Sequence, residues 1–201
     1  WITGICIFVG IFALSNMVFA SKLRKNRRPI VWQNNRLPIF VTDKVDTPCF
    51  FGIFRPTIYV TDETMADYTT LHHVVEHELT HFRHGDHIWS VLRCFCLALH
   101  WYNPLVWLAA FLSMRDSELA CDEDTIKRIG EDERIDYGRT LINLTCEKPA
   151  VGILSAATTM TGSKKSIKER ISFIAQRPKM AVYTLAAVLL VAAVSVGCTF
   201  S

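Results

Sequence analysis

The stretch His77-Glu78-Leu79-Thr80-His81 fits the pattern H-E-x-x-H and lies in a segment, 68–84, whose apolar residues recur with helical spacing. Residues four positions apart share one face of a helix, so both imidazoles can bind one zinc ion. Glu78 follows the first histidine and can act as a general base toward water at the metal. The pattern therefore predicts a zinc-dependent peptide-bond hydrolase.

A catalytic zinc site needs a third protein ligand, and a second helical segment supplies Glu118. Asp122 lies one helical turn further along the same face, and we predict that it accepts a hydrogen bond from a ligand histidine. Both acids could instead be solvated side chains of a surface helix. Spacing alone leaves open three further acidic candidates, namely Asp116, Glu123 and Asp124.

Two uncharged apolar segments, 1–20 and 180–197, are predicted to be transmembrane helices, since roughly 20 apolar residues cross a bilayer. Eleven of the 22 Lys and Arg residues lie just inside these segments, within 22–28 and 164–179. Cations near the ends of spans stay cytoplasmic. We therefore predict a multi-pass protein of the cell membrane whose peptidase domain, 22–179, is cytosolic. The sequence begins inside an apolar run without Met, so we expect a fragment.

The block 88–112 is almost wholly apolar and is interrupted at Asn103-Pro104. It is too short for two full crossings, and a single crossing would separate Glu118 from the two histidines. We predict either a buried helix pair or a re-entrant hairpin that dips into the bilayer.

Elsewhere the pattern predicts strands at 30–32, 39–41 and 57–60, with a turn or hairpin at 49–56. We expect strand 57–60 to hold an extended substrate by edge pairing. Three helices are predicted at 113–129, 135–146 and 165–176, with a loop at 147–166. The seven cysteines are scattered without a CxxC pair, which is typical of a reducing compartment.

The chain resembles the peptidase domain of the BlaR/MecR family of membrane-embedded sensor-transducers. The segments that carry the resemblance are 47–52, 55–60, 76–81, 100–107 and 115–123. It implies an α+β fold that is gluzincin-like, mainly helical with a small sheet, and flanked by transmembrane helices. It also implies zinc on His77, His81 and Glu118, with Glu78 as the base.

The resemblance further implies a role in signalling. An external signal, such as cell-wall antibiotic stress, would activate the peptidase to cleave itself or a transcriptional repressor. Self-cleavage is expected within 162–177. The sequence contains no S-x-x-K acylation motif, so we do not assign β-lactam binding to these residues.

Two other classes share some of these features. One is a membrane quality-control metallopeptidase of the HtpX or CAAX-prenyl-protease kind, and the other is a signalling scaffold that no longer cleaves. The net charge of +3 is too small to indicate direct nucleic-acid binding.

Overall fold

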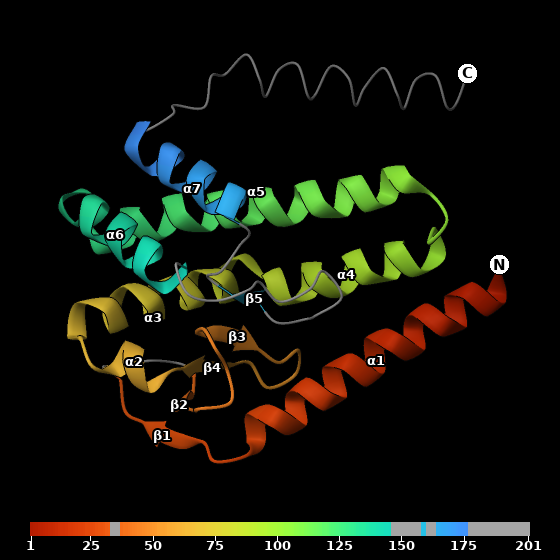
Figure 1. Cartoon of the computed structure of the whole chain (residues 1–201), viewed down its shortest axis with the longest axis horizontal. Helices are drawn as coiled ribbons and strands as arrows, with labels where there is room; N and C mark the ends of the chain where they lie inside the picture. Colours follow the sequence, from red (N-terminus) through yellow and green to blue (C-terminus); the bar gives the residue numbers. More distant parts are fainter. Residues whose placement is uncertain (33–36, 146–157, 160–163, 177–201) are drawn as a thin grey trace.

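The computed structural model describes residues 1–32, 37–145, 158–159 and 164–176. Helices predominate in this part of the chain, and short strands form one small sheet (Figure 1). The helices are α1 (Ile2–Arg24), α2 (Asp62–Met65), α3 (Tyr68–His84), α4 (Asp86–Leu99), α5 (Pro104–Ile129), the 3-10 turn η1 (Glu131–Glu133), α6 (Arg134–Thr145) and α7 (Lys164–Gln176). The strands are β1 (Arg28–Ile30), β2 (Ile39–Val41), β3 (Cys49–Phe51), β4 (Thr57–Val60) and β5 (Thr158–Thr159).

The sheet is mixed, with the strand order β1-β2-β4-β3-β5. β2 and β4 are parallel, whereas β3 is antiparallel to both β4 and β5. β4 is therefore an interior strand, and the prediction that it offers a free edge to substrate is wrong. The predicted loop 147–166 is also wrong at 158–159, where β5 pairs with β3, and at 164–166, where α7 begins.

Helix α3 matches its predicted limits because its ends carry clear signals. The Asp67 side chain accepts a hydrogen bond from the Thr70 amide at 2.8 Å and caps the first turn. Gly85 ends the helix in the left-handed conformation, with φ of 71°. Helices α6 and α7 likewise begin and end within a residue of their predicted limits.

Helix α5 runs unbroken over 26 residues, so the prediction of a separate helix at 113–129 is wrong. The break at Asn103-Pro104 is confirmed, since Asn103 caps α5 and Pro104 fills its first turn. Beyond Pro104 the composition changes from apolar to charged, but no residue interrupts the backbone. One rigid helix consequently joins the apolar block to the residues around Glu118.

The core lies between the sheet and the helices, with α3 at its centre. Phe50 and Ile58 of the sheet and Val75 of α3 are fully buried in one cluster, which Tyr137 of α6 joins. Helix α3 also packs against α5, α4 and α6. A central position gives the H-E-x-x-H helix little freedom to move, which suits a site that depends on fixed ligands.

Helices α1, α4 and the first half of α5 extend away from the sheet side by side (Figure 1). The Trp1 indole donates a hydrogen bond to the Leu99 carbonyl at 3.0 Å, and Phe8 packs edge-on against Trp107. Among the described residues, α1 is the one helix long and apolar enough to cross a membrane. The predicted span 180–197 lies outside the described residues.

The apolar block places many large side chains on the surface of the protein. Trp89 and Phe95 of α4 are 57% and 58% exposed, and Leu105 of α5 is 69% exposed. The first of the two alternatives for 88–112, a buried helix pair, would require these side chains to lie in a protein core, but they are exposed. An exposed apolar surface of this size is typical of contact with lipid or another protein.

Gly52 lies in the turn between β3 and β4, and Gly130, which follows α5, is a suitable control for substitutions in that turn. Their φ angles are 116° and 115°, but a Cβ at Gly52 would lie 2.4 Å from the Arg55 carbonyl oxygen, whereas one at Gly130 meets nothing within 4 Å. We expect Gly52→Ala to lower the free energy of unfolding by roughly 1–3 kcal/mol more than Gly130→Ala does. Chemical denaturation of both variants measures the difference, and equal losses would contradict this account of the turn.

Candidate metal centre

Helix α3 places His77 and His81 one turn apart, and both side chains are fully buried. Their Nε2 atoms face each other at 3.1 Å. From α5, the Glu118 carboxylate approaches both rings, with Oε1 3.5 Å from His81 Nε2 and Oε2 3.8 Å from His77 Nε2. The structure thus brings together the three side chains that sequence analysis predicted as ligands.

Hydrogen bonds at the opposite ring nitrogens orient the two imidazoles. His81 Nδ1 lies 2.5 Å from the Asp86 carboxylate, which can only accept a hydrogen bond. His77 Nδ1 lies 2.7 Å from the Tyr137 hydroxyl, which itself donates to Asp122 at 2.7 Å. In the neutral rings the proton therefore sits on Nδ1, and both Nε2 lone pairs point into the same space.

This arrangement fits a single metal ion. Ligand atoms about 2.0–2.1 Å from a tetrahedral zinc lie roughly 3.3 Å from each other, which is close to the separations of these nitrogen and oxygen atoms. Two lone pairs at 3.1 Å repel each other unless a proton or a cation lies between them. Burial lowers the pKa of His77 well below its usual value and favours its neutral, metal-binding form. The pKa of His81 is raised instead, because Cys121 and Glu118 outweigh its burial, so a metal ion would displace a proton from this ring.

Asp122 does not receive the predicted direct hydrogen bond from a ligand histidine. Its Oδ1 is 3.5 Å from His77 Nδ1, and the Tyr137 hydroxyl connects the two. Arg170 of α7 holds the same carboxylate with two charged hydrogen bonds, at 2.7 and 2.6 Å. The third guanidinium nitrogen lies 2.9 Å from Glu118 Oε2. Asp122 is therefore part of a buried charge network behind the histidines.

Glu78 is fully buried, and neither carboxylate oxygen has a hydrogen-bond partner of good geometry among the described residues. Burial raises the pKa of Glu78 to about 8, and the charge of Glu118 adds to this rise. A backbone hydrogen bond from Phe50 in β3 lowers the pKa of Glu78 and so offsets part of this rise. A buried carboxylate without a partner is costly, and its presence beside the histidines is typical of a catalytic group.

Cys121 is a second candidate for the third ligand, and sequence analysis did not consider it. His77, His81 and Cys121 are all buried, and one ligand atom from each lies within 4.8 Å of the others. The thiol sulfur is nearer to His77 Nδ1, at 3.5 Å, than to Nε2, at 3.9 Å. It also donates to the His77 carbonyl, and burial raises the pKa of the Cys121 thiol to about 11.

The other acidic candidates in α5 have surface partners. Asp124 pairs with Arg128 and His84, and the half-exposed Glu123 pairs with Lys127 and with the buried Arg134. No interaction with the site histidines is found for Asp116 in the part of the chain that the structure describes. The alternatives that spacing left open thus correspond to solvated positions on α5.

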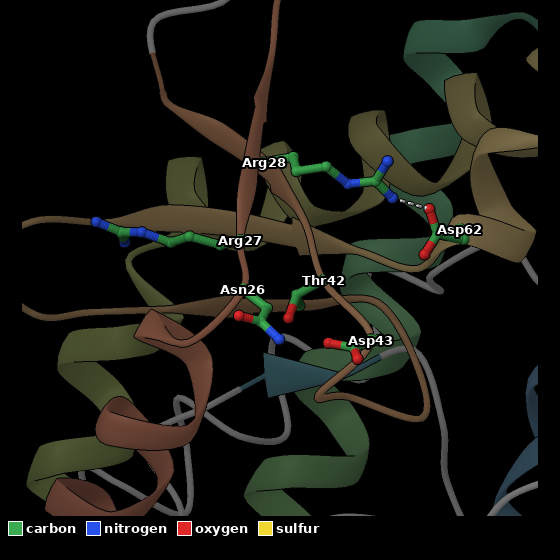
Figure 2. Close-up of a pocket in the computed structure, with 6 residues that line it drawn as sticks. All are labelled: Asn26, Arg27, Arg28, Thr42, Asp43 and Asp62. Atoms are coloured by element: carbon green, nitrogen blue, oxygen red, sulfur yellow. Dashed lines mark hydrogen bonds and ion pairs between the residues drawn. The ribbon is translucent and has the colours of Figure 1, made fainter.

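A polar pocket lies apart from the histidines, where α1 meets the sheet. Figure 2 shows Arg28 reaching toward Asp62, with which it forms an ion pair, while Arg27 extends in the opposite direction. The Arg27 guanidinium stacks over the Phe40 ring. None of the predicted site residues line this pocket, so we assign it no part in the chemistry.

Two histidines and a carboxylate around one point, with a further buried glutamate beside them, form the kind of site that defines metal-dependent hydrolases. Comparison with known families agrees with this class. The model of the family described as BlaR1 peptidase M56 matches residues 1–174, and the chain belongs to this family. The predicted BlaR/MecR resemblance is confirmed.

Two curated relatives show similar agreement. The chain is 28% identical over 188 residues to "Regulatory protein BlaR1" of Bacillus licheniformis, covering 85% of this chain and 31% of that protein. It is 28% identical over 193 residues to "Methicillin resistance mecR1 protein" of Staphylococcus aureus, covering 87% of this chain and 32% of that protein. The chain therefore spans about a third of the length of these relatives.

Proposed function

We propose that this chain is the zinc metalloendopeptidase part of a membrane sensor-transducer. The observation that carries the proposal is the convergence of both histidine Nε2 atoms and Glu118 on one point beside the unpartnered carboxylate of Glu78. Membership in a peptidase family supports hydrolysis of a peptide bond as the reaction.

In this proposal His77, His81 and Glu118 hold the zinc. The bound ion would supply Lewis-acid polarisation of the substrate carbonyl and would make attacking water more acidic. Glu78 accepts a proton from that water and delivers it to the leaving amine. The raised pKa of Glu78 suits both halves of this role near neutral pH. Asp86 and Tyr137 keep the two imidazoles in the metal-binding tautomer.

We prefer Glu118 to Cys121 as the third ligand for geometric reasons. Both carboxylate oxygens of Glu118 lie on the Nε2 side of the histidines, where the lone pairs converge. The sulfur of Cys121 lies nearer to the Nδ1 side of His77 and is engaged with the His77 carbonyl. With Glu118 as the third ligand, the site also has the two-histidine, one-glutamate ligand set that is known from catalytic zinc sites.

We propose that α4 and the start of α5 form the re-entrant hairpin, beside α1 in the bilayer. Their exposed apolar side chains and their contacts with α1 support this placement. The basic residues at the end of α1, Lys22 and Arg24, favour a cytosolic position for the metal centre. The peptidase would then work at the inner face of the cell membrane.

The proposed substrate is a cytosolic transcriptional repressor or an extended stretch of the protein itself. The printed names of the relatives, which refer to regulation and to methicillin resistance, support a signalling role in response to cell-wall antibiotics. Within the predicted cleavage range 162–177, residues 164–176 form α7, whereas peptidases bind extended chains. We therefore place self-cleavage outside α7. Family membership favours this role over a quality-control peptidase.

Removal of the metal tests the proposed function. Full-length protein in detergent micelles is treated with a chelator and assayed on a library of quenched fluorescent peptides and for its own processing. We expect both activities to disappear and to return with one equivalent of Zn²⁺. Hydrolysis that persists in zinc-free protein would contradict the proposal, and bound zinc without cleavage in either assay would favour the scaffold.

A further inference from the structure

Helix α7 brings a fully buried cation, Arg170, into the charge network behind the metal centre. Its side chain is the largest among the fully buried ones in the described part of the chain. We propose that Arg170 is a positioning residue that fixes the Glu118 carboxylate for metal binding, so that the metal centre is complete only when α7 is docked. This inference rests on the proposed function, because it takes Glu118 as a metal ligand.

The first argument is geometric. The Arg170 guanidinium forms two parallel bonds with Asp122, at 2.7 and 2.6 Å, and its remaining nitrogen lies 2.9 Å from Glu118 Oε2. A planar guanidinium fixed at two points cannot rotate away from the third. Glu118 Oε1 is thereby left on the side of His81 Nε2, at 3.5 Å.

The charges of Asp122 and Glu118 need a compensating cation. Asp122 and Glu118 lie one turn apart on α5, and Asp122 is 3% exposed. Two carboxylates this close repel each other unless a cation lies near both. The Arg170 guanidinium compensates both negative charges, since its nitrogens lie within 2.9 Å of both carboxylates. The cation comes from a different helix, so the balance depends on the packing of α7.

The packing of α7 connects it to the rest of the fold. Ile174 is buried in the main core, and Arg170 lies one turn earlier on the same face. Outside the network, Glu169 forms an ion pair with Arg115 on the surface of α5. A displacement of α7 would withdraw Arg170 from Glu118 and Asp122 together.

The experiment compares Arg170→Met and Arg170→Lys with Glu169→Gln, which removes the surface ion pair of the same helix. Zinc affinity is measured by competition with a chelating dye, and Co²⁺-loaded protein reports the ligand geometry through its visible spectrum. We expect Arg170→Met to weaken zinc binding about 10–100-fold and to change the Co²⁺ spectrum. Arg170→Lys should lose less zinc affinity than Arg170→Met. Glu169→Gln should have the zinc affinity and the Co²⁺ spectrum of the parent.

An Arg170→Met variant with parental affinity and spectrum would overturn the inference. If that variant does not fold, Arg170→Met combined with Asp122→Asn removes both charges, and we expect it to fold but to bind zinc weakly. Parental zinc binding in this folded double variant would also overturn the inference. Glu118→Gln separates the two proposals. If Glu118→Gln abolishes zinc binding but the Arg170 variants bind zinc as the parent does, only this inference fails. If the parent binds no zinc, or if Glu118→Gln binds zinc as tightly as the parent, the proposed function fails as well.

Discussion

Glu78→Gln is expected to reduce peptide hydrolysis about 10²–10⁴-fold while leaving one zinc per chain, because a general base contributes to the rate but not to metal binding. Glutamine has nearly the shape of glutamate but cannot accept the proton from water. The side chain is fully buried, and neither oxygen has a hydrogen-bond partner of good geometry among the described residues, so we expect the change to cost little stability. Paired measurement of turnover and zinc content checks both parts.

Glu76→Gln provides the control for this prediction. Glu76 lies two residues earlier on α3 and pairs with Arg83 near the surface. Its replacement should cost no more than about 1 kcal/mol of stability, as for exposed ion pairs in general, and should leave turnover at the parental rate. A Glu78→Gln protein that cleaves at the parental rate would mean that another group acts as the base.

Asp122→Ala is expected to lower the free energy of unfolding by about 3–5 kcal/mol, since it leaves a buried arginine with one carboxylate instead of two. Asp122 accepts hydrogen bonds from both Arg170 and Tyr137, so the alanine variant also leaves a buried hydroxyl without its acceptor. Thermal or chemical unfolding in detergent measures the loss.

Asp124→Ala is the matched control, because Asp124 lies half a turn later on α5 and pairs with Arg128 at the surface. An exposed pair of this kind contributes about 0.3–0.5 kcal/mol. Equal losses in the two variants would show that the network of Asp122 and Arg170 does not stabilise the fold.

The sequence predicted those elements whose signals are local. α3 carries its own cap at Asp67, its own stop at Gly85 and a regular apolar stripe, and its limits were predicted to the residue. The break at Asn103-Pro104 was equally local. The continuity of α5 was missed because a change from apolar to charged composition was interpreted as a boundary, although the backbone has no reason to break there.

The missed parts of the site depend on contacts between distant segments. Tyr137 is 60 residues from His77, and Arg170 is 48 residues from Asp122. Nothing in either local sequence distinguishes these residues from ordinary helix positions. Asp86 is different, since it lies five residues after His81 just past the helix end, and that short spacing could have indicated a hydrogen bond. The pairing of β5 with β3 is likewise non-local.

In the proposed metal centre, His77, His81 and Glu118 bind one zinc ion. The most direct test is zinc stoichiometry on the purified full chain and on the variants Glu118→Ala and Cys121→Ser, each confirmed as folded. We predict one zinc per chain in the parent and in Cys121→Ser, and none in Glu118→Ala. Zinc that is lost with Cys121→Ser and kept with Glu118→Ala would contradict this ligand set.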